Sequence, residues 1–199
     1  MSESPEGLEV FDGIITHAEE QDIIDFLDKQ EWDTTLSRLT QHYGYMYGYK
    51  SYKLTPTQSI PSKLSNLIDK IKRRLCRIDY DLEFDPDQCI VNNYQRGQMI
   101  SKHIDNTNLF GNMIVGLSLG SPADMIFRQA QCKPSDEGKP SVAAVSAGGK
   151  SSAEGKPYTI TLEPRSLMVL QDDARYKWTH ELKPLAGDRR ISITYRVTK

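Results

Sequence analysis

Two titratable residues, His103 and Asp105, lie one position apart in the segment ISKHID, and a second histidine, His180, lies far downstream in RYKWTHEL. Side chains alternate along an extended chain, so His103 and Asp105 would project to the same side. Two neutral imidazoles and one carboxylate on neighbouring corners of an octahedron form the facial triad of non-haem iron(II) oxygenases, which leaves positions open for a chelating co-substrate and O2. These residues are therefore candidate metal ligands.

Other interpretations of the same residues stay open on spacing alone. A zinc hydrolase can use two histidines and one carboxylate as ligands. An H-x-D pattern with a distant histidine also arises by chance, in which case the HID stretch is a polar turn that binds nothing.

The C-terminal segment RRISITYRV alternates polar and apolar residues. On a strand, its apolar residues would face one way and Arg190, Ser192, Thr194 and Arg196 the other. The planar guanidinium of arginine binds a carboxylate through two parallel N–H donors, so two arginines on one face suit a dicarboxylate. An edge strand with its polar face in water has the same pattern and is the alternative.

A third polar pair, Asn92 and Tyr94 in VNNYQRG, falls on one face of a predicted strand. The amide and the phenol are both able to hydrogen-bond the same anion. Asn-Asn-Tyr is also an ordinary composition where a strand enters a turn. The order of the patterns along the chain, N-x-Y, H-x-D, H and R-x-S-x-T-x-R, is more informative than any one of them.

In this order the motifs resemble those of the AlkB-like Fe(II)/2-oxoglutarate-dependent dioxygenases, over roughly residues 88–199, and RYKWTHEL is similar to the family's stretch around its distal histidine. The resemblance implies that His103, Asp105 and His180 ligate Fe(II). It also implies 2-oxoglutarate as co-substrate, with Arg190 and Tyr94 at its distal carboxylate. The full set of residues that it implies for 2-oxoglutarate is Asn92, Tyr94, Arg190, Ser192 and Arg196, of which Asn92 and Arg196 would hold the metal-chelating end.

The resemblance implies an enzyme that consumes 2-oxoglutarate and O2, releases succinate and CO2, and hydroxylates a C–H bond of its substrate. Hydroxylation of an N-methyl group gives a hemiaminal that releases formaldehyde, so an alkylated or modified base in DNA or RNA would be demethylated. The implied fold is a double-stranded β-helix (jelly roll) with flanking N-terminal helices. The implied partner is a nucleic acid, single-stranded or with its target base flipped out.

Two details are closer to one branch of the family. Ser192 stands where base-repair members often carry Asn, and Thr107, two positions after the metal aspartate, stands where they often carry an acidic residue. Together with QHYGY and GLSLGS, these details resemble the oxygenase domain of the tRNA wobble-uridine hydroxylase branch. Hydroxylation of a tRNA wobble uridine is therefore an alternative. A protein substrate and a non-catalytic nucleic-acid-binding module are further alternatives.

A tyrosine-rich segment, HYGYMYGYKSYKL, lies within residues 33–55, where AlkB-type proteins have a nucleotide-recognition lid. Its first four tyrosines, at positions 43, 45, 47 and 49, alternate and would align their rings on one face of a strand. Aromatic rings next to cations suit base stacking, at about 1–3 kcal/mol per base. The alternative is a hairpin that packs its tyrosines on the barrel rim. The candidate substrate-binding residues are Arg38, Gln41, Tyr43, Tyr45 and Tyr47.

Two helices precede the strand-rich part of the sequence. Thr16 and Glu19 form a predicted capping box before an apolar stripe, and a second helix begins near Pro61 with apolar residues at helical spacing. The other face of the second helix has a basic run at residues 70–74. Such a run suits phosphate binding or nuclear import, or is simply a solvated helix face.

Beyond residue 86 the sequence changes to short strand-like runs separated by Gly, Pro and Asn. This pattern predicts an α+β, mainly β, fold with a helical layer on a closed or double-sheet β structure. Residues 129–157, rich in Gly, Ser, Ala, Lys and Pro, predict a flexible insertion within a single domain that spans residues 1–199. The predicted strands are residues 88–94, 99–103, 113–119, 124–128, 158–162, 166–170 and 190–197.

The composition excludes several classes of protein. A net charge of −2 and a pI of about 6.1 provide no global basic field. The three cysteines have no CxxC spacing, which argues against a disulfide scaffold. The N-terminus lacks the apolar core of a signal peptide, and no apolar run is long enough to cross a membrane. We therefore expect a monomeric, intracellular protein of the cytoplasm or nucleus with no membrane partner.

Overall fold

Two antiparallel β-sheets form the body of the protein in the computed structural model, which describes residues 3–48, 51–130 and 156–199. The larger sheet has six strands in the order β1-β10-β7-β12-β5-β2. These strands are β1 (Leu8–Phe11), β2 (Leu39–Tyr43), β5 (Gln88–Gln95), β7 (Phe110–Gly120), β10 (Leu167–Leu170) and β12 (Arg189–Thr198).

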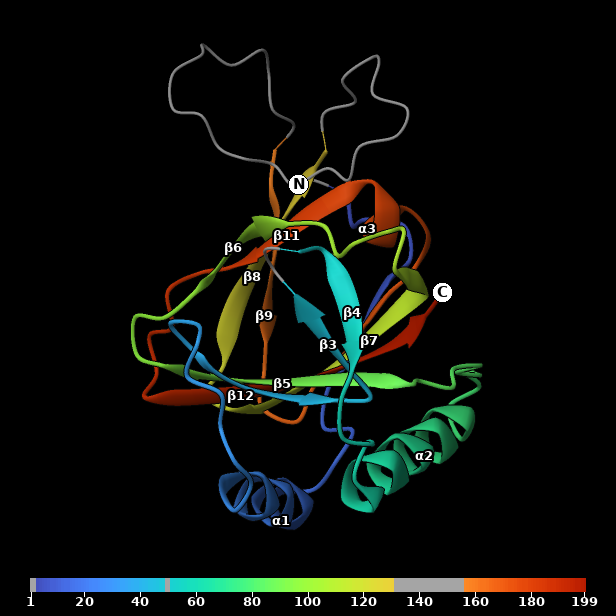
Figure 1. Ribbon diagram of the computed structural model, residues 1–199. Coiled ribbons are helices and arrows are strands. Elements are labelled where there is room, and N and C mark those ends of the chain that lie inside the picture. The colour runs from blue at the N-terminus through green and yellow to red at the C-terminus, as the bar shows by residue number, and fades with distance from the viewer. Residues whose placement is uncertain (1–2, 49–50, 131–155) are drawn as a thin grey trace.

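The smaller sheet has four strands in the order β6-β11-β8-β9, and in Figure 1 it lies above the larger sheet together with the hairpin β3–β4. This arrangement is the double-stranded β-helix that the resemblance implies, mainly β with two helices in the N-terminal half. The remaining strands are β3 (Tyr45–Gly48), β4 (Lys53–Pro56), β6 (Ile100–His103), β8 (Ala123–Gln129), β9 (Tyr158–Leu162) and β11 (Trp178–Leu182).

The two N-terminal helices, α1 (His17–Asp28) and α2 (Ser62–Cys76), lie together below the larger sheet in Figure 1. The predicted capping box is present, because the Thr16 and Glu19 side chains each accept a hydrogen bond from the other's backbone N–H. Glu19 also accepts from Arg74 of α2 through both carboxylate oxygens, at 2.8 and 2.9 Å. Part of the predicted basic run therefore serves to join the two helices.

The larger sheet is covered on both faces. Ile191, Ile193 and Tyr195 of β12 point toward the helices, and each is exposed by 1 % or less. A second apolar cluster, which includes Phe127 and Leu182, fills part of the space between the two sheets. Full burial of such a side chain stabilises the fold by about 1.5–3 kcal/mol. The residues of β12 that alternate with the apolar ones therefore enter the space between the sheets.

The strands predicted beyond residue 86 are all present, with ends that differ by a few residues. The sequence pattern does not predict β1, β11 or the short helix α3 (Asp172–Tyr176) that precedes β11. The β11 segment WTHEL is not predicted as a strand because it lacks a clear alternation of polar and apolar residues. Residues 131–155, which make up most of the predicted insertion, and Tyr49 lie outside the described residues. The flanking strands β8 and β9 pair with each other.

The expectation that the tyrosines share one strand face is wrong for Tyr43, Tyr45 and Tyr47. Gly44 has a φ of +74° and ends β2. A side chain could not replace its hydrogen, because a Cβ there would lie 1.8 Å from the Asp87 carbonyl oxygen. The chain turns at this glycine, so Tyr43 belongs to β2 whereas Tyr45 and Tyr47 belong to the hairpin β3–β4.

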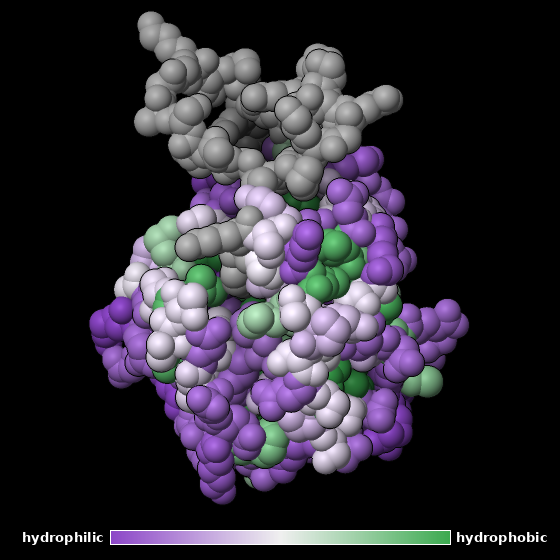
Figure 2. Space-filling model, viewed as in Figure 1, coloured by the Kyte–Doolittle hydropathy of each residue, from purple (hydrophilic) through white to green (hydrophobic). Residues whose placement is uncertain are grey.

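The face of the molecule in Figure 2 is mostly hydrophilic, and its apolar side chains occur in small separate groups. A large contiguous apolar patch would mark a docking surface, and this face has none among the described residues. Within the same part of the chain, no helix is long and apolar enough to cross a membrane.

Candidate metal centre and co-substrate cavity

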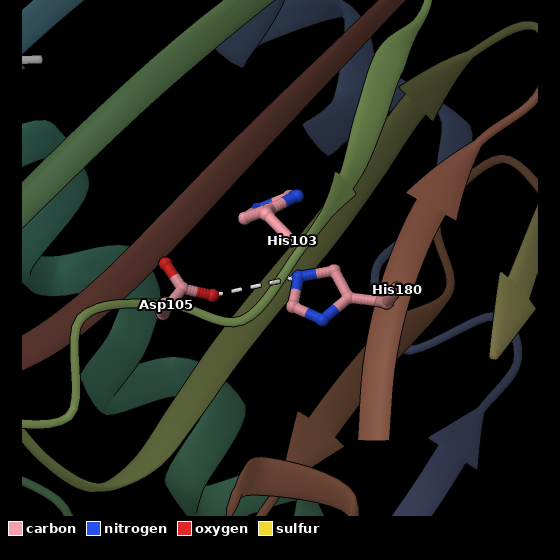
Figure 3. A group of neighbouring side chains, drawn as sticks. All are labelled: His103, Asp105 and His180. Carbon is pink, nitrogen blue, oxygen red and sulfur yellow. Dashed lines mark ion pairs between the residues drawn. The ribbon is translucent and has the colours of Figure 1, made fainter. Parts of the chain in front are cut away.

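His103 and His180 face each other across two neighbouring strands of the smaller sheet. They are directly opposite in the antiparallel pair β6–β11, and their ring centroids lie 4.3 Å apart. Asp105 lies two residues beyond the end of β6, with its carboxylate directed toward His180 (Figure 3). One donor atom from each residue lies within 4.8 Å of the other two. The three predicted ligands therefore converge, and they could hold a metal ion.

The protonation state of His103 suits a metal ligand. His103 Nδ1 lies 2.8 Å from the Ser101 carbonyl oxygen, so this nitrogen carries the proton and Nε2 is the available donor atom. Burial, assisted by the neighbouring His180, lowers the pKa of His103 to about 4. The imidazole is therefore neutral at pH 7, which is the form that binds metal ions.

The carboxylate of Asp105 is held in its charged form. Burial alone would raise the pKa of this carboxyl, but the charge of Arg196 and the hydrogen bond with His180 outweigh burial and keep the pKa well below its usual value. Arg196 Nη2 donates to Asp105 Oδ1 at 2.5 Å, while Oδ2 lies 3.4 Å from His180 Nε2. A charged carboxylate beside two imidazoles is a suitable donor set for a divalent transition metal.

A cavity between the two sheets opens beside these ligands. His103, Asp105 and His180 line it. All the residues that the family resemblance assigns to 2-oxoglutarate line it as well, namely Asn92, Tyr94, Arg190, Ser192 and Arg196. The register of β5 and β12 explains this convergence, since Asn92 is opposite Ser192 and Tyr94 is opposite Arg190. The structure thus brings both predicted sets of residues to one cavity.

Arg190 is only 3 % exposed, and its guanidinium meets no carboxylate among the described residues. It donates to the Ser118 hydroxyl at 2.9 Å and lies 5.6 Å from the centroid of the Tyr94 ring. Burial lowers the pKa of Arg190, and the Nε atom has no hydrogen-bond partner. Because a buried cation without an anionic partner is costly, a carboxylate that enters the cavity would be bound at this guanidinium.

Two further cavity residues are oriented by neighbours. Arg196 Nη1 donates to Gln88 Oε1 at 3.2 Å, in addition to its bond with the metal-site carboxylate. Asn92 Oδ1 accepts from Arg38 Nε at 2.7 Å. The residues predicted to hold the chelating end of 2-oxoglutarate are therefore fixed by side chains that belong to other elements.

Three of the predicted substrate residues lie near the cavity. Arg38 contacts cavity residues directly, with its guanidinium 5.9 Å from the centroid of the Tyr94 ring. The Tyr47 ring lies 6.1 Å from the Phe110 ring, and the Tyr45 carbonyl accepts from Gln88 at 3.3 Å. The hairpin β3–β4 is therefore connected to residues that support the metal centre.

The other two predicted substrate residues, Gln41 and Tyr43, face away from the cavity. Gln41 Nε2 donates to the Leu27 carbonyl at 2.9 Å, and the Tyr43 hydroxyl donates to Gln41 Oε1 at 3.0 Å. Both lie on the helix side of β2, 2 % and 1 % exposed. The structure therefore removes them from the candidate substrate contacts. Thr40, which is opposite Asn92 in β5, is on the cavity side instead.

Sequence reasoning missed three residues that support the site, Gln88, Ser118 and Phe110. Gln88 and Ser118 hydrogen-bond to the two cavity arginines, and the Phe110 ring lies 4.9 Å from the guanidinium carbon of Arg196. Period-two spacing places Gln88 on the same face as Asn92, which is the one signal that could have found it. Nothing local marks the other two, because their partners are distant in sequence.

Comparisons with known proteins agree with this geometry. A sequence model described as the 2OG-Fe(II) oxygenase superfamily matches residues 14–196. The Arabidopsis thaliana protein named "Alkylated DNA repair protein ALKBH8 homolog" is 31 % identical over 96 % of this chain and 58 % of its own length. The Mus musculus protein named "tRNA (carboxymethyluridine(34)-5-O)-methyltransferase ALKBH8" is 28 % identical over 92 % of this chain and 25 % of its own length.

The chain therefore spans a quarter to somewhat over half of the length of these two relatives. The solved structure described as OsALKBH1 superposes with a TM-score of 0.70 at 17 % identity, and the match covers 99 % of both chains. At this level of identity, the likeness supports the fold.

Proposed function

The chain belongs to the 2OG-Fe(II) oxygenase superfamily, and we propose that it oxidises an alkylated or modified base in DNA or RNA, releasing the alkyl group by oxidative demethylation. It is an AlkB-like dioxygenase that uses Fe(II), 2-oxoglutarate and O2. When bound, Fe(II) supplies the centre at which O2 is activated while 2-oxoglutarate is converted to succinate and CO2. This class of enzyme is favoured over the non-catalytic binding module considered from the sequence.

We assign the metal to His103, Asp105 and His180, because their donors converge beside the cavity and because no other group of this kind is present in the described part of the chain. We assign the distal carboxylate of 2-oxoglutarate to Arg190 and Tyr94. The remaining residues assigned to 2-oxoglutarate are Asn92, Ser192 and Arg196.

One observation carries this assignment. The guanidinium of Arg190 is buried in the same cavity as the metal ligands and lacks a carboxylate partner among the described residues. The arginine needs an anion and the metal needs further ligands. A small dicarboxylate would supply both, with one carboxylate at the arginine and its other end at the metal. A monocarboxylate or a neutral ligand would leave either the arginine or the metal without its partner.

For the substrate, we propose a nucleobase held next to the cavity by Arg38, Tyr45 and Tyr47. Arg38 is suited to a phosphate or a base edge, and Tyr45 and Tyr47 stand on the hairpin that contacts the supports of the metal centre. The names of two relatives refer to DNA repair and to a tRNA uridine, which supports a nucleic acid over a protein substrate.

Hydroxylation of a tRNA wobble uridine, without loss of a methyl group, is a second candidate. The name of the mouse relative refers to a carboxymethyluridine of tRNA. Ser192 in the co-substrate strand and Thr107 after the metal aspartate are among the residues on which the resemblance to the tRNA branch rests. These two residues favour the tRNA branch.

Incubation with Fe(II), 2-oxoglutarate, O2 and a panel of methylated DNA, methylated RNA and tRNA separates the two candidates. Demethylation lowers the product mass by one CH2 group and releases formaldehyde, whereas hydroxylation raises the mass by one oxygen atom. Turnover only with a peptide substrate would show that the nucleic-acid proposal is wrong.

The role of the hairpin is tested with Tyr47→Leu. Loss of a stacking ring is expected to raise the KM for an oligonucleotide substrate about 5- to 150-fold, from about 1–3 kcal/mol per stacked base. The matched control is Tyr80→Leu, since Tyr80 packs on Phe11 at 4.8 Å on the helix side of the protein. Equal effects of the two substitutions would contradict a substrate role for Tyr47.

We also propose that the protein acts as a monomer inside the cell, in the cytoplasm or the nucleus. The thiols of Cys76 and Cys89 are free, as expected in a reducing compartment. The hydrophilic face in Figure 2 is consistent with a monomer. Sedimentation of the purified protein tests its oligomeric state.

A further inference from the structure

Asp105 differs from the two histidines in how the fold holds it. His103 and His180 are directly opposite residues of paired strands, so the hydrogen-bond ladder of the sheet fixes their positions. Asp105 lies beyond the end of β6, where this ladder has ended. Because a metal ligand must be held within a fraction of an ångström, something else must position the segment of residues 105–111, which leads from the end of β6 into the start of β7.

The Arg175 side chain holds this segment by its backbone carbonyls. Its guanidinium donates to the carbonyl oxygens of Asp105 at 2.9 Å, Gly111 at 3.2 Å, Asn106 at 3.4 Å and Phe110 at 3.4 Å. The side chain is 2 % exposed, and among the described residues it bonds to no carboxylate side chain. A planar fork of five N–H donors can bond several carbonyls at once, which a single ammonium group cannot.

The segment of residues 105–111 carries two groups that contact Arg196. At one end the Asp105 carboxylate accepts from Arg196 Nη2, and at the other the Phe110 ring lies 4.9 Å from the guanidinium carbon of Arg196. Arg175 itself lies in α3, immediately before the strand that carries His180. One side chain thus joins the segment of one metal ligand to the segment of another.

We infer that Arg175 is a positioning residue of the metal centre, which sets the place of the Asp105 carboxylate through the carbonyls of residues 105–111. This inference rests on the proposed iron and 2-oxoglutarate site. Without the guanidinium, the segment of residues 105–111 would lose four hydrogen bonds, and Asp105 and Phe110 would no longer hold Arg196 on both sides. Metal affinity and the slot for 2-oxoglutarate should therefore weaken together.

Direct metal binding tests this inference without turnover. Mn(II), which stands in for Fe(II) and resists oxidation, is titrated into the metal-free protein and followed by electron paramagnetic resonance. Arg175→Met is expected to weaken Mn(II) binding about 10- to 100-fold, the usual effect of removing a residue that orients a metal ligand. Arg175→Lys is expected to weaken Mn(II) binding nearly as much, because a point charge cannot bond all four carbonyls.

The matched control is Arg189→Met. Arg189 also makes several hydrogen bonds that join distant segments, to Asp28 at 2.8 and 2.5 Å and to Asn93 at 3.2 Å, but these lie away from the metal centre. The Arg189→Met substitution is expected to lower the melting temperature and leave Mn(II) affinity unchanged. A purely structural role of Arg175 would give the same result as this control.

The outcomes are distinct. If folded Arg175→Met binds Mn(II) within about twofold of the wild type, the inference is overturned; if that variant does not fold, the same criterion applied to Arg175→Lys decides. Absence of Mn(II) binding by the wild type would instead count against the proposed function. The absorption spectrum of the Co(II)-loaded protein gives a second readout, since a displaced carboxylate changes the ligand field.

Discussion

Strand β12 presents opposite chemistry to the two interiors of the molecule. Toward the helices it places Ile191, Ile193 and Tyr195, and the Tyr195 hydroxyl donates to the Leu64 carbonyl at 3.0 Å. Toward the cavity it places two arginines, Arg190 and Arg196, whose buried Nε atoms have no partner. The helix side is therefore apolar and satisfied in its hydrogen bonds, whereas the cavity side holds buried charge that needs a ligand.

This difference separates stability from function within one sheet. Apolar burial on the helix side stabilises the fold whether or not a ligand is bound. The buried guanidinium of Arg190 on the cavity side opposes folding until an anion compensates it. Substitutions on the helix side should therefore lower stability, whereas substitutions on the cavity side should weaken ligand binding. The following experiments test that separation.

The largest effect is expected at the metal ligands of the cavity side. His103→Ala should abolish metal binding and 2-oxoglutarate turnover, because two remaining ligands no longer form the facial set. The fold should stay intact, since His103 lies on the edge strand of the smaller sheet. Succinate formation and Mn(II) binding measure the loss. Unchanged turnover in this variant would contradict the assignment of His103 as a metal ligand.

The next largest effect is expected at Arg190. Arg190→Met should raise the KM for 2-oxoglutarate at least about 30-fold, since loss of one partner of a buried charge pair costs about 2 kcal/mol or more. The ligand-free variant should unfold at the same or a higher urea concentration, because an uncompensated buried charge has been removed. A variant that is less stable yet binds 2-oxoglutarate normally would reverse the expected roles of the two faces.

On the helix side, Ile193→Ala is the matched change within the same strand. It should destabilise the protein by about 2–5 kcal/mol, from lost burial and the cavity that it leaves. The KM for 2-oxoglutarate should stay unchanged, because Ile193 faces away from Ser192 and Thr194, which line the cavity. Urea unfolding and steady-state kinetics measure the two quantities. If Ile193→Ala raised the KM as much as Arg190→Met, the two faces of β12 would not differ in function as proposed.

The smallest effect is a pH dependence that arises on the cavity side. Burial lowers the pKa of His103 to about 4 and also lowers the pKa of His42. The unfolded chain therefore binds more protons than the folded protein below pH about 6.5. This contribution to the stability of the metal-free protein is fully present above that pH and is lost as the pH falls toward 4.

Urea midpoints at pH 7.5 and pH 5 measure this dependence. His42→Gln should reduce the change between the two values, because one group that resists protonation in the folded state is gone. The control His17→Gln should leave it unaltered, since that side chain is 81 % exposed. A larger change in the His42 variant than in the wild type would contradict the assignment.

Local sequence was sufficient where a single periodicity decides the outcome. The alternation in RRISITYRV predicts which residues of β12 share a face, and the cavity arginines lie where it places them. The capping box at Thr16 and the start of α2 after Pro61 are also local signals, and both are present. In each case the interacting groups are close along the chain.

Local sequence failed where one residue interrupts the period. The alternation of tyrosines predicts a single strand face, but Gly44 ends β2 and the face is divided between two elements. The reason is tertiary, because the close approach of the Asp87 carbonyl excludes a side chain at this position. As a result Tyr43 faces the helices and Tyr47 faces Phe110.

The sequence by itself determined which donor groups are available and which of them share a strand face, because side-chain alternation needs only the neighbouring residues. Only the tertiary structure decided that His180 lies opposite His103, that Arg190 is buried without a carboxylate partner among the described residues, and that Arg175 binds the loop of Asp105. These contacts join residues far apart in the chain. Their register depends on the pairing of whole strands and on the packing of the two sheets, which no local pattern encodes.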